Sequence, residues 1–268
     1  MSDPLAARLS AAGCVWAHDE AAALREAFGD DAGALQAAAA RREAGEPLEQ
    51  VTGRAALAHV VVATAPGVFV PRRRSEVLVH EAVARLPQGG TVVDLCCGTG
   101  AVGLAVAGAR GAVLHACDVD PRAVACARGN LATLPGAQVH EGDLDAALPT
   151  ALAGCVDVLV AVTPYVPTAA LPSLPAEARD WEPRLALDGG TDGLDVARRL
   201  VAAAPRWLAP HGRLLTEVSR EQAAALVLAA AAVGLAAQVV DDEEHDVAVV
   251  VAGPPVGSLP VQGGRAGR

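Results

Sequence analysis

Three glycines are spaced in a way that could hold a nucleotide-like ligand. Gly98, Gly100 and Gly103 fit the pattern G-x-G-x-x-G directly after the apolar run of residues 91–95. Glycines at such a turn let the backbone approach a ligand, and the helix that follows offers free N–H groups. Taken alone the pattern is weak, because dinucleotide-binding proteins and many structural turns share it.

Acidic residues follow three successive β-prone runs. Asp94 closes the first run, Asp118 ends the second, and Asp143 comes just after the third. A carboxylate at the end of a second strand can accept hydrogen bonds from both ribose hydroxyls of a nucleoside, and Asp143 could accept one from an adenine amino group. The alternative is that Asp94 caps a loop and the other two cap helices. Three acids at successive strand ends favour a ligand site.

A second candidate for chemistry, V-T-P-Y at residues 162–165, follows the fourth β-prone run. Pro164 and Tyr165 fit a loop wall with an aromatic face for a planar group, or a rigid turn with a packed tyrosine. Trp181 is a candidate for substrate contact, or for packing of its own loop. The arginines of residues 72–74 could receive an acidic patch of a partner or a carboxylate, although such runs are more often solvated.

Alternating β-branched runs and alanine-rich helices must position these residues. The pattern begins at Gly89 and is typical of a parallel sheet covered on both faces. Two later runs flank an acidic turn at residues 241–245, which predicts an antiparallel pair at the sheet edge. The seven runs span residues 91–95, 113–117, 138–141, 156–161, 213–218, 236–240 and 247–252. The sequence therefore predicts an α/β fold with a seven-stranded, mostly parallel sheet.

The first third of the chain has a different pattern. Residues 3–45 carry apolar positions at helical spacing with a break at Asp30-Asp31, which predicts a small helical domain over residues 1–46. The runs 59–62 and 68–70 predict a β-hairpin around Ala65-Pro66-Gly67, within a linker of residues 47–75. The main domain is then expected at residues 76–252, and the Gly- and Pro-rich residues 253–268 as a disordered tail.

Composition narrows the classes of function and partner. The net charge of −10 repels phosphate backbones, so no nucleic-acid partner is expected. The six cysteines form neither a C-x-x-C pair nor a Cys/His cluster, which predicts no metal site and no disulfide framework, only buried reduced thiols. No signal-like or membrane-length apolar stretch is present in the 268 residues, which favours a cytoplasmic protein without a membrane partner.

The glycine loop with its three acids resembles the S-adenosylmethionine site of class I methyltransferases. The resemblance implies a Rossmann-like fold and S-adenosylmethionine as cofactor. A nicotinamide enzyme is the competing interpretation, but it would keep the first glycine tight against the strand, without the spacer at residues 94–97. The cofactor-binding residues that the resemblance implies are Asp94, Cys96, Gly98, Thr99, Gly100, Asp118, Val119, Asp143 and Leu144.

Further segments resemble the HemK/PrmC-type protein N5-glutamine methyltransferases over roughly residues 40–252. The V-T-P-Y run is similar to their N-P-P-Y element, and E-P-R-L-A-L-D-G-G-T-D-G-L at residues 182–194 to their E-P-x-x-A-L-x-G-G-x-D-G-L. The linker carries P-L-E-Q-V-T-G and V-F-V-P-R-R-R-S-E, where the family usually has P-R-P-E-T. The resemblance implies substrate recognition by the N-terminal helices and methylation of a protein glutamine, for example in a peptide-chain release factor. The implied catalytic residues are Val162, Thr163, Pro164 and Tyr165.

The chain departs from this family pattern where the asparagine is expected. In the family, the asparagine and a neighbouring carbonyl accept hydrogen bonds from the substrate amide, whereas Val162 has no acceptor. An unpaired donor costs about 1–3 kcal/mol, or roughly 5- to 150-fold in rate. Thr163 or backbone carbonyls could accept these hydrogen bonds instead. Asn130, the only asparagine, cannot do so, because it lies in the helix after the second strand. The alternatives are a cofactor-binding pseudo-enzyme, a methyltransferase for a small molecule and, less well supported, a DNA adenine methyltransferase.

Overall fold

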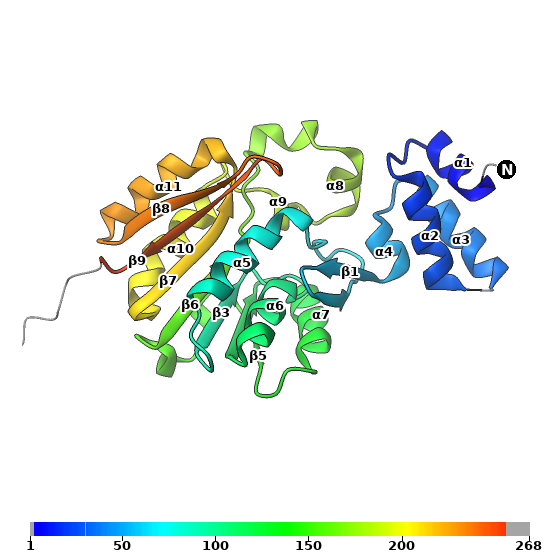
Figure 1. The fold of residues 1–268 in the computed structure, drawn as a ribbon. Coiled ribbons are helices and arrows are strands. Elements are labelled where there is room, and N and C mark those ends of the chain that lie inside the picture. Colours follow the sequence, from blue (N-terminus) through cyan, green and yellow to red (C-terminus); the bar gives the residue numbers. More distant parts are fainter. Residues whose placement is uncertain (1–2, 30, 256–268) are drawn as a thin grey trace, which may run out of the picture.

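A central seven-stranded sheet dominates the computed structural model, which describes residues 3–29 and 31–255 (Figure 1). The strand order is β5-β4-β3-β6-β7-β9-β8, and the first five of these strands are parallel. The hairpin β8–β9 closes one edge, because β9 runs antiparallel to β7. The strands are β3 (Thr91–Leu95), β4 (Val113–Asp118), β5 (Gln138–Glu141), β6 (Val156–Ala161), β7 (Leu208–Val218), β8 (Ala236–Asp242) and β9 (Val247–Gly253). The predicted sheet is confirmed.

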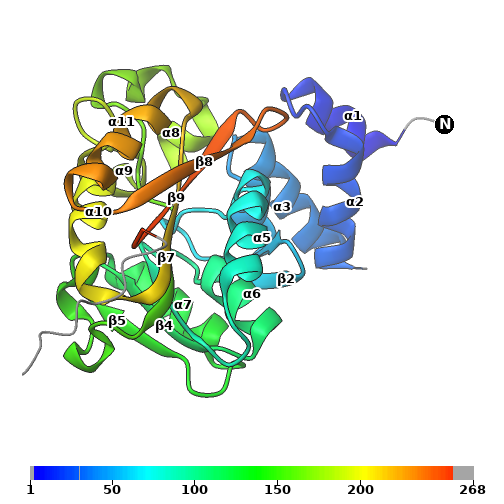
Figure 2. The same ribbon diagram turned by 60° about the vertical axis from the view of Figure 1, so that its left-hand side comes forward.

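Helices cover both faces of this sheet. One face packs on α5 (Glu76–Arg85), α6 (Ala101–Arg110) and α7 (Pro121–Leu131), and α5 and α6 lie side by side (Figures 1 and 2). The other face packs on α10 (Asp195–Trp207) and α11 (Arg220–Ala232). Val92 points into the first core and Val93 into the second, because neighbouring side chains of a strand point to opposite faces. Burial on both sides explains why inner strands such as β6 and β9 read as nearly continuous apolar runs.

The N-terminal helices have a small core of their own at one end of the molecule (Figure 1). They are α1 (Pro4–Ala11), α2 (Ala17–Phe28), α3 (Ala32–Glu43) and α4 (Leu48–Thr52). Leu9 and Leu24 are fully buried there, among alanines that let the helices approach closely. The break expected near Asp31 is present, and a further break at Gly13, with φ of +95°, was not expected.

The linking hairpin is present, and the predicted run 59–62 corresponds to one of its strands, but the predicted run 68–70 is wrong. β1 (Arg54–Leu57) pairs with β2 (Val60–Ala63) through a turn at Ala58, whose φ is +51°. Residues 68–70 form no strand, because β2 pairs with the segment before it. Val68 and Val70 are both buried, and Val68 lines the main cavity, which is described below. Burial, and not strand pairing, therefore accounts for valine at these two positions.

Short helices fill the connections around the sheet. They are η1 (Arg73–Ser75), η2 (Leu144–Ala147), η3 (Thr150–Leu152), η4 (Thr168–Ser173), α8 (Ala176–Trp181) and α9 (Arg184–Leu187). α8 reaches the N-terminal helices, because Glu177 forms an ion pair of 3.3 Å with Arg42, and the indole of Trp181 faces Gly45. Trp181 is thus a packing residue that lies outside the lining of the main cavity.

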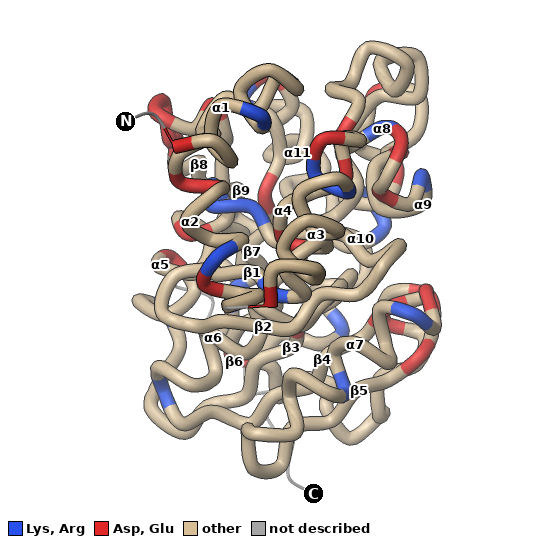
Figure 3. The backbone as a smooth tube through the Cα atoms, turned by 90° about the vertical axis from the view of Figure 1, so that its right-hand side faces the viewer, with Lys and Arg blue, Asp and Glu red and all other residues tan. Residues whose placement is uncertain are grey.

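Charged residues of both signs are spread over the backbone trace (Figure 3). Among the described residues, no helix has both the length and the apolar composition needed to span a bilayer. Gly253, predicted as the first residue of the tail, is instead the last residue of β9. The rest of the predicted tail, from residue 256, lies outside the described residues.

Candidate active site

The main cavity, of about 190 Å³, lies at the carboxyl ends of β3, β4 and β6. Ligands of open α/β sheets bind at this edge, because the strand order reverses there. The structure brings eight of the nine predicted cofactor-binding residues into its lining: Asp94, Cys96, Gly98, Thr99, Asp118, Val119, Asp143 and Leu144. Gly100 is not in the lining. It is the N-terminal cap of α6, with φ of +79°.

Asp94 is held beneath the glycine loop. Its Oδ2 accepts a hydrogen bond of 2.8 Å from the backbone N–H of Gly103, and the residue is 1% exposed. Burial raises the pKa of Asp94 to about 7, against the Gly103 hydrogen bond, which lowers it. A Cβ on Gly103 would come within 2.9 Å of the same Oδ2, so only glycine fits at the third position of the motif.

Asp118 shapes the loop that it faces. Its Oδ2 accepts from the N–H of Gly98 at 2.9 Å, and its Oδ1 accepts from the N–H of Asp120 at 2.9 Å. The cap of α7 is Asp120, which accepts from Arg122, so the alternative that Asp118 caps this helix is wrong. Burial raises the pKa of Asp118, while backbone N–H donors lower it. Since each carboxylate oxygen has two lone pairs, both can still accept from a ribose.

Asp143 is paired with a residue that the sequence did not single out. Its Oδ2 lies 2.7 Å from a guanidinium nitrogen of Arg199 on α10, and both side chains line the cavity. Asp143 makes no capping hydrogen bond to η2. Next to it, Leu144 has a φ of +49°, and Cys96 on the opposite loop has a φ of +57°. Such conformations cost non-glycine residues energy and cluster at functional sites.

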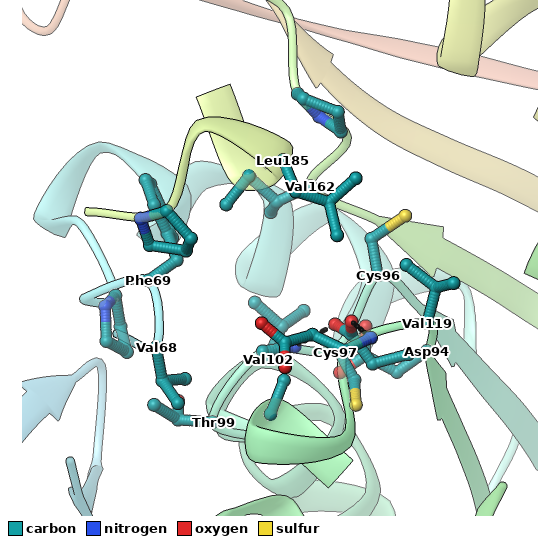
Figure 4. A pocket seen from close by; sticks show the side chains of 18 of the residues that line it. Val68, Phe69, Asp94, Cys96, Cys97, Thr99, Val102, Val119, Val162 and Leu185 are labelled. Carbon is teal, nitrogen blue, oxygen red and sulfur yellow. Dashed lines mark hydrogen bonds between the residues drawn. The ribbon is translucent and has the colours of Figure 1, made fainter. Parts of the chain in front are cut away.

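The second half of the cavity has a mainly apolar wall. Val162 and Pro164 of the V-T-P-Y run line it, together with residues of the linker and of the α8–α9 connection. Figure 4 shows Val162 beside Leu185 at one side of the cavity, with Thr99 and Val102 at the other. The additional apolar lining residues include Val68, Phe69, Pro71, Pro183, Leu185 and Ala186.

Thr163 and Tyr165 lie outside the cavity lining. The hydroxyl of Thr163 is buried and has no hydrogen-bond partner among the described residues. Tyr165 instead donates its phenolic proton to Oε1 of Glu217 at 3.2 Å, and Arg74 lies over its ring at 5.5 Å. The structure therefore places Tyr165 as a packed tyrosine rather than as an aromatic wall.

Two buried glutamates organise the linker around the cavity. Glu217 on β7 is fully buried and accepts from Ser75 at 2.6 Å and from Arg74 at 3.3 Å. Glu182 accepts from Arg72 at 2.6 Å and from the N–H of Val70 at 3.3 Å. The expectation that the arginine run receives a carboxylate is therefore confirmed for Arg72 and Arg74, since both face these buried glutamates.

The glycine-rich element at residues 189–193 packs on the backbone of the V-T-P-Y run. A Cβ on Gly189 would lie 2.6 Å from the carbonyl oxygen of Pro164, and one on Gly193 would lie 2.2 Å from that of Tyr165. Gln222 donates to the Tyr165 carbonyl at 2.8 Å. These contacts fix the position of Pro164 relative to the sheet, which explains why this element carries glycines.

All six cysteines are free thiols, as the sequence predicts. The expectation that they are buried is wrong for Cys155, which is exposed in the turn before β6. Burial raises the pKa of Cys96 and Cys97 in the glycine loop, so these thiols are weak nucleophiles. They act as small apolar residues beside the cavity.

Comparison with known proteins assigns the chain to a family. Residues 59–165 match the model of the methyltransferase small domain. A release factor glutamine methyltransferase of Geobacter sulfurreducens is 37% identical over 201 residues, which are 74% of this chain and 69% of that protein. One of Moorella thermoacetica is 40% identical over 201 residues, 73% of this chain and 70% of that protein. This chain belongs to the release factor glutamine methyltransferase family.

Solved structures agree with this family's fold. A ribosomal protein L11 methylase of Lactobacillus delbrueckii covers 72% of the chain with a TM-score of 0.53 and 14% identity, and 84% of that chain is matched. A T. Thermophilus 16S rRNA methyltransferase, solved with AdoMet and guanosine, covers 75% of the chain with a TM-score of 0.54 and 24% identity, and 50% of that chain is matched. At these identities they show the class I methyltransferase fold.

S-adenosylmethionine is the cofactor of this family, and the site has a suitable donor set. Gly98 has a φ of +54° and no Cβ to fill the cavity, while Asp118 and Asp143 present carboxylates at two neighbouring strand ends. Asp94 adds a third carboxylate to the cavity lining. The residues present therefore fit the cofactor.

Proposed function

We propose that this protein transfers a methyl group to the side-chain amide nitrogen of a glutamine in a peptide-chain release factor. Its relatives carry that activity in their names. The observation that carries the proposal is the continuous cavity that joins the glycine loop and Asp118 to Val162 and Pro164. The bound cofactor supplies an electrophilic methyl group on its sulfonium.

The acceptor half of the cavity suits a planar, weakly nucleophilic nitrogen. An amide lone pair is delocalised into its carbonyl, so catalysis depends on orientation and on exclusion of water. Phe69, Val162 and Leu185 provide apolar walls for both purposes. Since the Thr163 hydroxyl does not line the cavity, the backbone carbonyls of the V-T-P-Y run are the acceptors that it can offer to an amide.

The proposal also assigns roles to the other parts of the chain. The helices of residues 1–46 recognise the protein substrate, and their contact with α8 through Arg42 and Glu177 connects them to the loop over the cavity. The linker spans residues 47–75 and the methyltransferase domain residues 76–252. A cytoplasmic location is part of this proposal, because the six free cysteines suit a reducing compartment.

The test combines cofactor binding with transfer of labelled methyl to a purified release factor. We expect saturable binding of S-adenosylmethionine in a calorimeter and label in the release factor, but not in a variant whose exposed loop glutamine is replaced by alanine. Binding without transfer would contradict the proposal and indicate a pseudo-enzyme. Label that enters a small-molecule pool but not the release factor would indicate a redirected enzyme.

A further inference from the structure

The hydroxyl of Ser75 can accept a hydrogen bond, which the side chain of Val162 cannot. Both residues line the main cavity, but they come from segments far apart in the sequence, the linker and the end of β6. The same cavity is lined by Pro71, Val162 and Pro164, whose side chains have no hydrogen-bond acceptor. A substrate amide at this wall would need an acceptor for its N–H groups, since a buried unpaired donor is costly.

Glu217 fixes the orientation of this hydroxyl. Its carboxylate is fully buried, and Oε2 accepts the Ser75 proton at 2.6 Å. Because the hydroxyl proton points to Glu217, the lone pairs of Oγ remain for a second partner. Ser75 is 3% exposed and lines the cavity, so a molecule bound in the cavity can supply this partner.

The same carboxylate places Ser75 beside the V-T-P-Y run. The other oxygen, Oε1, accepts from the hydroxyl of Tyr165 at 3.2 Å and from Arg74 at 3.3 Å. One glutamate thus holds the linker hydroxyl and the loop tyrosine on its two oxygens. The position of Ser75 relative to Val162 and Pro164 is therefore set by the fold.

We propose that Oγ of Ser75 accepts a hydrogen bond from the NH2 group of the substrate glutamine and so orients its nitrogen for methyl transfer. This inference rests on the proposed function and adds an acceptor-binding residue to it. Glu217 is the positioning residue, because it acts on the substrate only through Ser75. The arrangement gives the active site a side-chain acceptor although residue 162 is valine.

The experiment compares four forms of the full chain with release factor as substrate: wild type, Ser75→Ala, Ser75→Thr and the double variant Ser75→Ala with Val162→Asn. We expect Ser75→Ala to lower kcat about 5- to 150-fold, with the Kd of S-adenosylmethionine unchanged within about twofold. Ser75→Thr keeps the hydroxyl and should retain most of the activity. In the double variant, the amide oxygen of the introduced asparagine supplies a new acceptor, so activity should recover at least in part.

The rescue separates substrate contact from structural damage. Asparagine at position 162 cannot replace a packing role of Ser75, because it makes no bond to Glu217. Full activity in Ser75→Ala, or a loss that the second substitution does not restore at all, would overturn the role of Ser75. If wild type transfers no methyl to glutamine, the proposed function itself fails, and the two failures are thereby distinguished.

Discussion

The backbone N–H of Gly103 donates to Oδ2 of Asp94 over 2.8 Å, and this contact joins the end of β3 to the first turn of α6. It requires an acceptor oxygen at position 94 and no side chain at position 103, because a Cβ there would collide with that oxygen and with Leu114. Asp94 and Gly103 therefore depend on each other for their packing. Their contact also fixes the shape of the glycine loop above them.

Replacing Gly103 by alanine should therefore damage both stability and cofactor binding. The new Cβ would lie 2.9 Å from Asp94 Oδ2 and 2.9 Å from Leu114, and overpacking of this kind costs about 1–3 kcal/mol. Gly108→Ala is the matched control, because Gly108 lies in the same helix and a Cβ there would meet no heavy atom within 4 Å. The control should gain about 0.4–1 kcal/mol. Urea unfolding measures both, and equal effects would refute the packing argument.

Asp94 should make the stability of the cofactor-free protein depend on pH. Its pKa is raised from 3.8 to about 7, so between these values the native state binds more protons than the unfolded state. The free energy of unfolding should thus fall as pH rises from about 4 to 7, by a few kcal/mol. Asp94→Asn does not titrate, so its stability relative to wild type should increase over that range. Parallel pH profiles of the two proteins in urea unfolding would contradict the assignment.

Asn130 should be required for a well-ordered glycine loop. Its Oδ1 accepts from the N–H of Ala63 at 2.8 Å, and its Nδ2 donates to the carbonyls of Ala63 and Thr99 at 2.9 Å. Asn130→Asp removes both donors and places a charge beside two carbonyls, with an expected loss of about 1–3 kcal/mol. Calorimetry should also show weaker binding of S-adenosylmethionine. Gly129→Ala, which has free space, should leave binding unchanged.

The contact of Arg72 with Glu182 should matter more than the charge of Arg73. The Glu182 side chain is fully buried, so Arg72→Met would leave it without its charged partner and cost about 2–4 kcal/mol. Adding Glu182→Gln removes the charge but keeps an acceptor for Val70, so it should recover part of this loss. Arg73→Met, at an exposed position, should change stability by about 0.5 kcal/mol or less. Thermal unfolding of the four proteins decides between these outcomes.

The centre of the sheet was predictable because its inner strands are buried on both faces. Runs such as residues 156–161 therefore have a strong local signal. Once the strand ends are predicted, the acids that stand there are located as well. Residues 68–70 have the same local signal, but there burial beside the cavity, and not strand pairing, selects valine. Periodicity cannot distinguish these two causes.

The acceptor half of the cavity could not be predicted from local patterns. Ser75, Val162 and Leu185 come from three separate segments and line one cavity only through the tertiary fold. The P-R-R-R-S-E run indicated the linker. It did not indicate which of its residues face buried glutamates, because those glutamates lie on β7 and in the α8–α9 connection. The sequence likewise contains no information on the direction of the Thr163 side chain.

The position of the methyl group after a single turnover tests glutamine methylation most directly. The protein, S-adenosylmethionine and a release factor are mixed at stoichiometric concentration, and the release factor is digested and fragmented in a mass spectrometer. We expect one added methyl on the side-chain nitrogen of a glutamine. A methyl group on any other residue, or an unmodified release factor although the cofactor is bound, would contradict this expectation.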